Sequence, residues 1–445
     1  MATHVTPRRA AVASFVGTTV EFYDFLIYGT AAALVFPKLF FPGTSPTTGM
    51  LLSFATFGVG FVARPLGGIV FGHFGDRVGR KRMLVYSLLL MGGSTVAMGL
   101  LPTYAQIGLA APLLLTGLRL IQGFAVGGEW GGATLMAVEH APSDRKGFYG
   151  AFPQMGAPAG TALATLAFYA VSLLDDAAFL SWGWRIPFLA SAVLIAIGLV
   201  IRLSLTESPE FAAVQQHSTV VRVPLTEAFR RHWRQILLVA GAYLSQGVFA
   251  YICVAYLVSY ATSVAGIDRT DALFGVFVAA VVAVLTYPLF GSLADRVGRK
   301  PVFLMGVLAM GATALPTFAL INTGDAVWFL VALVLVFGLA MAPAAGVTGS
   351  LFALVFDTDV RYTAVSVGYT LSQVLGSAFA PTIAVALYNS TKTSDSIAAY
   401  LIVVSIISAL SVAFLPGPLS WGGTRRPRTA EAATSAPGTA LGPIG

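Results

Sequence analysis

Long apolar stretches separated by short polar or Pro/Gly-rich breaks run through almost the whole chain. Most of them reach the length of about 20 residues that a helix needs to cross a bilayer. The stretches lie near residues 12–36, 49–71, 83–103, 107–138, 147–174, 184–205, 236–262, 271–292, 301–321, 326–350, 362–388 and 396–416. The pattern therefore predicts an all-α membrane protein with twelve transmembrane helices.

The longest polar break divides the predicted helices into two groups of six. We therefore expect an N-terminal bundle over residues 1–205, a cytoplasmic central loop over 206–235 and a C-terminal bundle over 236–416. The tail, 417–445, is rich in Pro, Gly, Thr and Ala and has no apolar period, so we expect it to be disordered.

Composition agrees with a chain that lies mostly in lipid. Of the 445 residues, 57% are hydrophobic and only 10% are charged, whereas soluble domains carry about a quarter charged residues. The net charge of +7 does not indicate nucleic-acid binding, because the basic residues sit at the ends of the predicted spans. The single cysteine, Cys253, excludes an intramolecular disulfide.

The basic residues also predict the orientation. If the N-terminus is cytoplasmic, twenty of the 26 Lys and Arg residues fall on the cytoplasmic side and two fall within spans. Only four fall outside, namely Lys38, Arg185, Arg269 and Lys392. By the positive-inside rule we expect a multi-pass protein of the plasma (inner) membrane with both termini in the cytoplasm.

An internal repeat supports the division into halves. The segment Gly72-His-Phe-Gly-Asp-Arg-Val-Gly-Arg-Lys81 recurs, with changes, 219 residues later as Gly291-Ser-Leu-Ala-Asp-Arg-Val-Gly-Arg-Lys300. Gln154 and Gln373 have the same separation. Duplicated six-helix units are typical of secondary transporters, which bind solute between the halves near the bilayer midplane.

Competing classes of function lack their sequence features. The chain has no phosphate-binding loop, no nucleophile elbow and no zinc-type histidine motif. Its central loop and tail are too short for a signalling domain. We therefore expect neither an enzyme nor a solute sensor, and no bound metal.

The repeated Asp-Arg-Val-Gly-Arg-Lys loops resemble the signature of the major facilitator superfamily. Five further stretches resemble its metabolite:proton symporter family, whose members include permeases for shikimate, α-ketoglutarate, citrate, and proline or betaine. These are Val20-Glu-Phe-Tyr-Asp-Phe25, Ala63-Arg-Pro-Leu-Gly-Gly68, Gly72-His-Phe-Gly-Asp-Arg77, Gln122-Gly-Phe-Ala-Val-Gly-Gly-Glu-Trp-Gly-Gly132 and Ser181-Trp-Gly-Trp-Arg-Ile-Pro-Phe188.

The resemblance implies a two-bundle fold and the import of a small polar metabolite with a proton, by alternating access. An organic acid or a zwitterionic osmolyte would be the solute. It also implies that the proton is the coupling ion, that no cofactor is needed, and that a monomer in the bilayer is functional. An uncoupled facilitator or a proton-antiporting exporter of the same fold is the alternative.

Two charged residues within spans are candidates for proton coupling. An ionised carboxylate at the position of Asp24 is costly unless it is paired, hydrated or protonated. In related sugar:proton symporters an aspartate in span one faces an arginine in span four, and the resemblance maps these roles onto Asp24 and Arg119. A static ion pair is the alternative. Glu21, near the same helix face as Asp24, either shares the proton or has a structural role.

Arg64 and Glu129 lie at similar depth in spans two and four. They either pair across the interior, or Arg64 receives a carboxylate of the solute with its bidentate guanidinium. Other candidate solute-binding residues are polar or aromatic positions that fall at helical spacing. They are Tyr28, Gln122, Gln154, Tyr243, Gln246, Tyr369 and Gln373, with Tyr23 and Tyr251 as further members of the set. A tyrosine in a span is more often a packing or interfacial residue, whereas an unpartnered amide is costly in lipid.

The repeated loops predict a cytoplasmic gate. Their aspartates can cap the N-terminus of a neighbouring helix, and their cations can form charge pairs at the span ends. The expected gate residues are Asp76, Arg77, Arg80, Glu139, Arg145, Glu207, Asp295, Arg296, Arg299 and Arg361. The alternative, that these loops are only topology signals, explains the basic residues but not the repeated aspartate and glycines.

Overall fold

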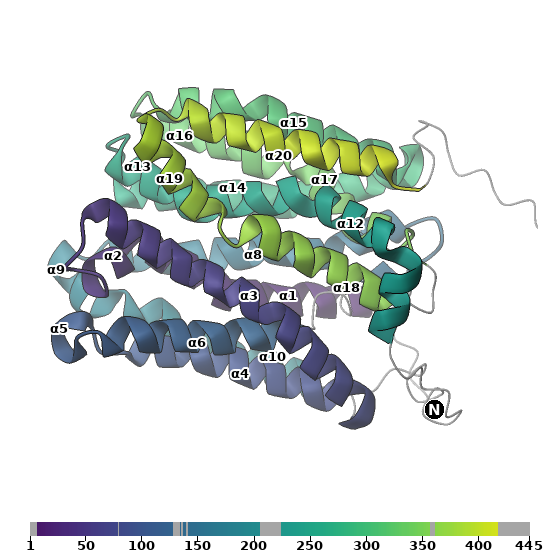
Figure 1. Cartoon of the computed structure of the whole chain (residues 1–445), viewed down its shortest axis with the longest axis horizontal. Coiled ribbons are helices and arrows are strands. Elements are labelled where there is room, and N and C mark those ends of the chain that lie inside the picture. The colour runs from purple at the N-terminus through teal and green to yellow at the C-terminus, as the bar shows by residue number, and fades with distance from the viewer. Residues whose placement is uncertain are drawn as a thin grey trace, which may run out of the picture.

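The computed structural model of this chain is a bundle of helices that run along a common axis (Figure 1). It describes residues 7–78, 80–127, 134, 137–138, 141–204, 224–356 and 361–416. Of these, residues 10, 69, 72–78, 80–84, 201–204, 224–229 and 361–362 are described by their backbone alone. Helices occupy all twelve stretches that the apolar pattern predicts, although not every predicted edge is right.

The first half contains six long helices. They are α1 (Pro7–Leu34), α3 (Pro46–Val78), α4 (Arg80–Leu100), α6 (Ala110–Val126), α8 (Lys146–Ser172) and α10 (Arg185–Ser204). Short elements join them, namely α2 (Phe36–Leu39), α5 (Tyr104–Ile107), α9 (Asp176–Ala178) and the π-helical turn η1 (Phe179–Gly183).

In the second half, three of the six spans are interrupted by a π-helical segment. The interrupted spans are α12 (Pro224–Tyr251) with η2 (Ile252–Tyr256) and α13 (Leu257–Ser263), α16 (Ala326–Leu333) with η3 (Val334–Ala340) and α17 (Ala342–Phe352), and α18 (Arg361–Ser372) with η4 (Gln373–Ser377) and α19 (Ala380–Thr391). The other three are α14 (Arg269–Val297), α15 (Arg299–Ile321) and α20 (Asp395–Phe414). Because π turns are wider than α turns and occur frequently at functional sites, these three segments are candidate parts of a functional site.

Length and apolarity support the membrane assignment. Within the described ranges, eight helices are long and apolar enough to span a bilayer, and the bent pair Asp176–Gly183 with Arg185–Val200 is a ninth. Two shorter apolar helices, Val85–Leu100 and Ala110–Val126, lie in two more predicted stretches. The remaining stretch is α8, which is rich in Gly, Ala, Thr and Pro and packs inside the bundle.

Two predicted edges are wrong. Helix α12 begins at Pro224, so the last part of the predicted loop 206–235 is helical, and a kink at His232, with φ of −127°, separates this part from the rest of the span. Proline is favoured at the first turn of a helix, where its missing N–H costs nothing. The predicted span 107–138 is also broken at its start, because Gly108, with φ of 58°, separates α5 from α6.

Helix α8 lies at the centre of the molecule and packs against α1 in its own half and against α14 and α17 in the other (Figure 1). Glycines permit the close approach to α1. A Cβ atom on Gly156 would lie 2.5 Å from Cβ of Thr18, and one on Gly160 would lie 2.7 Å from the backbone nitrogen of Tyr23. The Gly-Ala-Pro-Ala-Gly cluster of this span therefore serves helix packing.

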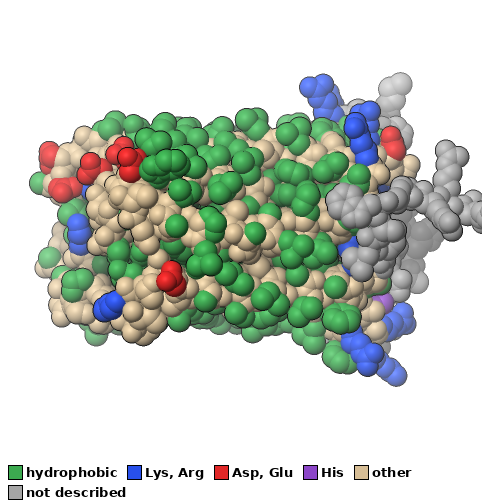
Figure 2. Space-filling view, turned by 90° about the horizontal axis from the view of Figure 1, so that it is seen from above, with side chains coloured by type: hydrophobic (Ala, Val, Ile, Leu, Met, Phe, Trp, Pro, Cys, Tyr) green, Lys and Arg blue, Asp and Glu red, His purple; other side chains and the backbone are tan. Residues whose placement is uncertain are grey.

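The two ends of the bundle differ in their balance of charge: on the face shown in Figure 2, acidic side chains gather at one end, with some basic ones among them, and basic side chains predominate at the other. At one end, here called the basic end, lie Arg145, Lys146, Arg230, Arg231, Arg234, Arg296 and Arg299. At the other, the acidic end, lie Asp175, Asp176, Asp268, Asp271, Asp325 and Asp395. An apolar belt separates them, as expected for a protein that spans a bilayer.

Candidate functional site

Asp24 lies in the middle of α1 and is completely buried. Neither oxygen of its carboxyl group has a hydrogen-bond partner. The hydroxyl of Ser191, on α10, faces the group without hydrogen-bonding geometry. Asp24 is thus an isolated buried carboxyl group, which is a costly arrangement for the ionised form.

Arg119, on α6, is also completely buried, but it forms no ion pair with Asp24. Its Nη1 donates instead to Oε1 of Gln122. The Nε2 of Gln122 donates to the backbone oxygen of Asp24 at 3.0 Å and to Oγ1 of Thr95 at 2.7 Å. Asp24 and Arg119 therefore form no static ion pair in this conformation, because the Gln122 amide binds the guanidinium and links it to the backbone of residue 24.

Aromatic rings hold both buried arginines. The guanidinium carbon of Arg119 lies 3.8 Å from the ring centre of Phe25 and 4.3 Å from that of Tyr28. The guanidinium carbon of Arg64, on α3, lies 4.3 Å from the same Phe25 ring and 4.6 Å from that of Phe61. The sequence analysis missed Phe25 as the contact shared by two cations, because nothing in a span of apolar residues distinguishes one phenylalanine from another.

Arg64 and Glu21 lie behind the phenol of Tyr251. Both are close enough to Tyr251 and Tyr369 to interact with them electrostatically. The Tyr251 ring packs against Phe61, with ring centres 5.1 Å apart. Glu129, the predicted partner of Arg64, lies outside the described residues.

A cavity lies between the halves, on the other side of Tyr251. It offers about 50 Å³ to the centres of water molecules, which is room for roughly four waters. Its walls come from α1, α8, α12, α14 and all three π segments of the second half. Among the described residues that line it, none is charged, and the polar ones are Gln154, Thr161, Tyr243, Gln246, Tyr251, Tyr287 and Gln373.

Only some of the predicted solute-binding residues line the cavity. Gln154, Tyr243, Gln246 and Gln373 line it, and Tyr251 does so as well. Arg64, Tyr28 and Gln122 do not line it. Tyr28 donates to Oγ1 of Thr56 at 2.8 Å, and the Tyr23 hydroxyl donates to the backbone oxygen of Pro187, so both have structural partners.

Tyr369 lies one layer behind the lining, where its hydroxyl accepts a hydrogen bond of 2.9 Å from Nε2 of Gln373. Tyr287 and Thr161 were missed in the sequence, since tyrosine and threonine are common in spans for reasons of packing. In the part of the chain that the structure describes, no group of His, Cys, Asp or Glu side chains is placed to hold a metal ion.

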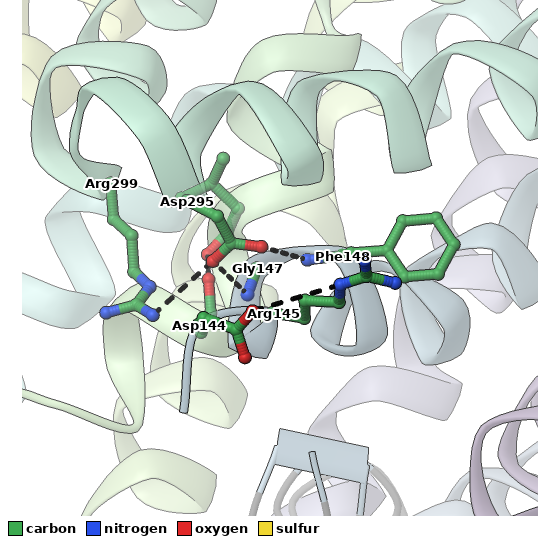
Figure 3. A network of polar contacts seen from close by, with 8 residues as sticks. Asp144, Arg145, Gly147, Phe148, Asp295 and Arg299 are labelled. Carbon is green, nitrogen blue, oxygen red and sulfur yellow. Dashed lines mark hydrogen bonds and ion pairs between the residues drawn. The ribbon is translucent and has the colours of Figure 1, made fainter. Parts of the chain in front are cut away.

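At the basic end, Asp295 connects the halves (Figure 3). Its two carboxylate oxygens accept the backbone N–H groups of Gly147 at 2.7 Å and Phe148 at 2.9 Å. These are N–H groups of the first turn of α8, where the helix dipole favours negative charge. Arg299 lies 3.6 Å from the same carboxylate. Asp295 thus occupies the capping position that the repeat predicts.

The other predicted gate residues are less informative. Arg145, the N-cap residue of α8, contacts the exposed Asp144 at 4.0 Å (Figure 3). Arg296 lies on the last turn of α14. The side chains of Asp76, Arg77, Arg80 and Arg361, and the residues Glu139 and Glu207, lie outside what the structure describes.

At the acidic end, a second contact joins the same two helices. Arg269, the first residue of α14, donates to Oδ1 of Asp176 at 2.9 Å and to the backbone oxygen of Ser172 at 3.2 Å. Ser172 is the last residue of α8, where the helix dipole favours a cation. Residues at the two ends of α14 therefore cap the two ends of α8, and the cavity lies between these two contacts.

Comparison with known proteins identifies the family. The sequence profile of the Major Facilitator Superfamily matches residues 14–381 and 266–442. The chain is 42% identical to the shikimate transporter of Escherichia coli K12, over 91% of this chain and 93% of that protein. It is 34% identical to the proline/betaine transporter of Salmonella typhimurium LT2, over 91% and 82%.

The fold agrees with this relationship. A crystal structure of a D-xylose-proton symporter superposes with a TM-score of 0.70 and 18% identity, covering 91% of this chain and 96% of that one. The chain is therefore a multi-pass membrane transporter of small metabolites and not an enzyme. It belongs to the Major Facilitator Superfamily, in the metabolite:proton symporter family that its motifs predicted.

Proposed function

We propose that this transporter imports an organic acid or a zwitterion together with a proton, and that Asp24 carries the proton. The observation that carries the proposal is the complete burial of Asp24 with neither carboxyl oxygen hydrogen-bonded. An ionised carboxylate in that place would cost several kcal/mol. In this conformation the group therefore holds a proton.

Arg119 moves when Asp24 loses that proton. A charged Asp24 attracts the guanidinium, which reaches the carboxylate only by leaving Oε1 of Gln122 and the Phe25 ring. Because Gln122 also binds the backbone oxygen of Asp24, the exchange of partners pulls on α1. Helix α1 contributes Phe22 and Leu26 to the cavity, so a change at Asp24 is transmitted to the solute site.

Alternating access then follows from the two contacts between α8 and α14. The positive-inside rule supports a basic end that faces the cytoplasm, with both termini on that side of the inner membrane. Opening toward the cytoplasm breaks the Asp295 cap, and opening outward breaks the Arg269 contacts. The halves, residues 1–205 and 236–416, rock about the cavity. A monomer suffices, since one chain encloses the whole cavity.

Uptake into proteoliposomes tests the proposal. A panel of radiolabelled shikimate, α-ketoglutarate, citrate, proline and glycine betaine is offered with an inward proton gradient, and again after a protonophore dissipates the gradient. We expect one class of solute to accumulate above its outside concentration, and only while the gradient is present. Equilibration indifferent to the gradient would instead identify a facilitator, and gradient-driven efflux would identify an antiporting exporter.

A further inference from the structure

A serine of the last span, α20, forms hydrogen bonds with the backbone of α12. Ser408 is completely buried where these two helices pack together. Its hydroxyl accepts the backbone N–H of Ser245 at 2.9 Å and donates to the backbone oxygen of Gly241 at 2.8 Å. The hydroxyl thus uses its donor and one acceptor position on two backbone groups of another helix.

The two backbone groups belong to the same turn of α12. Gly241 and Ser245 are four residues apart, so their C=O and N–H groups are the acceptor and the donor of one helical hydrogen bond. Ser408 therefore binds both members of one backbone pair. A side chain inserted at such a pair is a known cause of helix bending, because both groups keep a partner when their own bond lengthens.

Neighbouring serines of α20 form a different kind of bond. The hydroxyl of Ser405 donates to the backbone oxygen of Leu401 at 2.9 Å, and that of Ser411 donates to the backbone oxygen of Ile407 at 2.8 Å. Both bonds run to the residue four positions earlier in the same helix, as serines within helices commonly do. The bonds of Ser408 to α12 are therefore not a consequence of its place in a helix alone.

A glycine in α12 permits the close approach of α20. A Cβ atom on Gly241 would lie 2.2 Å from Oγ of Ser411, so a side chain at this position would displace that serine. Glycine also weakens the interior of a helix, because it loses more conformational freedom on folding than other residues do. The turn from Gly241 to Ser245 therefore combines a flexible residue with an additional partner for its hydrogen bond.

This turn lies behind the wall of the cavity. Tyr243 lines the cavity and is two residues from both Gly241 and Ser245, so it projects from nearly the opposite side of α12. Four residues that follow the turn also line the cavity, namely Gln246, Gly247, Ala250 and Tyr251. A bend at this turn would move that segment relative to the first part of α12, although Ser408 itself does not line the cavity.

We propose that Ser408 is a positioning residue for transport, because its hydroxyl makes the turn from Gly241 to Ser245 a hinge of α12. When the halves rock, the backbone bond of this turn lengthens while both groups stay bonded to Ser408, and the cavity-lining segment moves. Without the hydroxyl, the same motion leaves two backbone groups without partners inside the membrane, which is costly. The inference rests on the alternating access of the proposed function, but not on its proton site.

Solute counterflow in proteoliposomes, without a proton gradient, tests the hinge. The probe is whichever of radiolabelled shikimate, α-ketoglutarate, citrate, proline and glycine betaine wild type exchanges fastest, and equilibrium binding of the same probe counts the active sites. In Ser408→Ala we expect the maximal exchange rate per binding site to fall about fivefold, the value of one hydrogen bond, and the dissociation constant to change by less than about twofold. Lost stability alone does not change a rate per binding site.

Ser405→Ala is the matched control, because it removes a buried hydroxyl of the same helix that bonds within that helix. It should exchange the probe like wild type. Ser408→Cys has nearly the volume of serine but forms only weak hydrogen bonds, so its rate should also fall, and it remains informative if Ser408→Ala does not fold. Equal rates per site in Ser408→Ala and Ser405→Ala would overturn the inference. So would a dissociation constant raised as much as the rate is lowered, because Ser408 would then act on solute binding.

Failure of the hinge and failure of the proposed function are distinguishable. If wild type exchanges the probe but accumulation ignores the proton gradient, the coupling proposal fails, and the comparison of Ser408→Ala with Ser405→Ala still tests the hinge. If accumulation follows the gradient but both variants exchange the probe equally well, coupling stands and the hinge is wrong.

Discussion

The charged cluster around Asp24, Arg64 and Arg119 and the central cavity lie on opposite sides of Tyr251, and they are built differently. The cluster comes from α1, α3 and α6 of one half and contains charged groups, aromatic rings and one bridging amide. The cavity is enclosed by both halves, and no charged residue lines it among those described. In the proposed mechanism, proton chemistry therefore stays within one half, whereas solute recognition uses the surface between the two halves.

Because they are built differently, the two sites change in different ways when the protein moves. A site within one half changes only by local exchange of partners, such as Arg119 moving between Gln122 and Asp24. A site between halves changes its width whenever the halves rock. Helix α1 belongs to both sites, with Phe22 and Leu26 in the cavity wall and Asp24, one turn before Tyr28, in the cluster. We therefore propose that coupling passes through α1 and Tyr251.

Among variants of the charged cluster other than those at Asp24, Arg119→Lys should have the largest effect on accumulation. A lysine keeps the charge but cannot contact the rings of Phe25 and Tyr28 and bind Gln122 Oε1 as a planar guanidinium does. We expect gradient-driven accumulation to fall by more than about tenfold, because interactions of this kind are worth about 2 kcal/mol when buried. Arg230→Lys, at an exposed position of the basic end, is the control. Accumulation equal to wild type would remove Arg119 from the switch.

Loss of the Gln122 bridge should have the next largest effect. Gln122→Leu keeps the volume but frees Arg119 to approach Asp24, so the deprotonated state becomes more stable. We expect the half-maximal pH of proton-driven uptake to move to lower pH, since a stronger acid needs a higher proton concentration to be loaded. Initial uptake rates measured across external pH check the direction. A shift to higher pH would contradict the assigned role of Gln122.

The caps at the two ends of α8 allow a test of whether each contact holds its own end of the two halves together. Asp295→Asn removes the negative charge at the helix N-terminus, and Arg269→Gln removes the cation at its C-terminus. Each change should favour opening at its own end by about fivefold, as a helix-terminus charge is worth about 1 kcal/mol. Spin-label distances between the halves, measured at both ends, should shift in opposite senses. Identical shifts in the two variants would disprove independent latches.

Phe25→Leu should have a smaller effect that is confined to the cluster. It removes the ring that both guanidiniums contact but leaves their hydrogen bonds in place. We expect accumulation to fall about threefold to fivefold, the value of one cation–π contact, with little change in solute exchange. Phe414→Leu, at an exposed position of α20, provides the control. A matching loss of exchange would mean that the cluster and the cavity are not separate.

Most of the fold could be predicted from the sequence, because apolar length and the positive-inside rule act on long segments. The position of Asp295 was readable from the repeat. The start of α12 was not readable, since the polar residues after Pro224 form a helix that precedes the span and is set off from it by a kink at His232.

The site was predicted as a set of residues but not as an arrangement. Gln154 and Gln373 were identified, because an amide in a span needs a partner. Two features were beyond the sequence. The π turns that present Tyr251 and Gln373 carry no composition signal, and the insertion of Gln122 between Asp24 and Arg119 depends on side-chain geometry. Arg64, which seemed suited to hold a solute carboxylate, instead lies behind the aromatic rings.

The most direct test of the separation is Asp24→Asn, measured in the same proteoliposomes for accumulation and for counterflow. Asparagine matches the shape of the protonated carboxyl but cannot release a proton. The account predicts that gradient-driven accumulation disappears while solute counterflow stays within about twofold of wild type, because the cavity wall is unchanged. Asp395→Asn, at an exposed position of the acidic end, should preserve both activities. Loss of counterflow together with accumulation, in a folded Asp24→Asn protein, would contradict the account by placing Asp24 in the solute site.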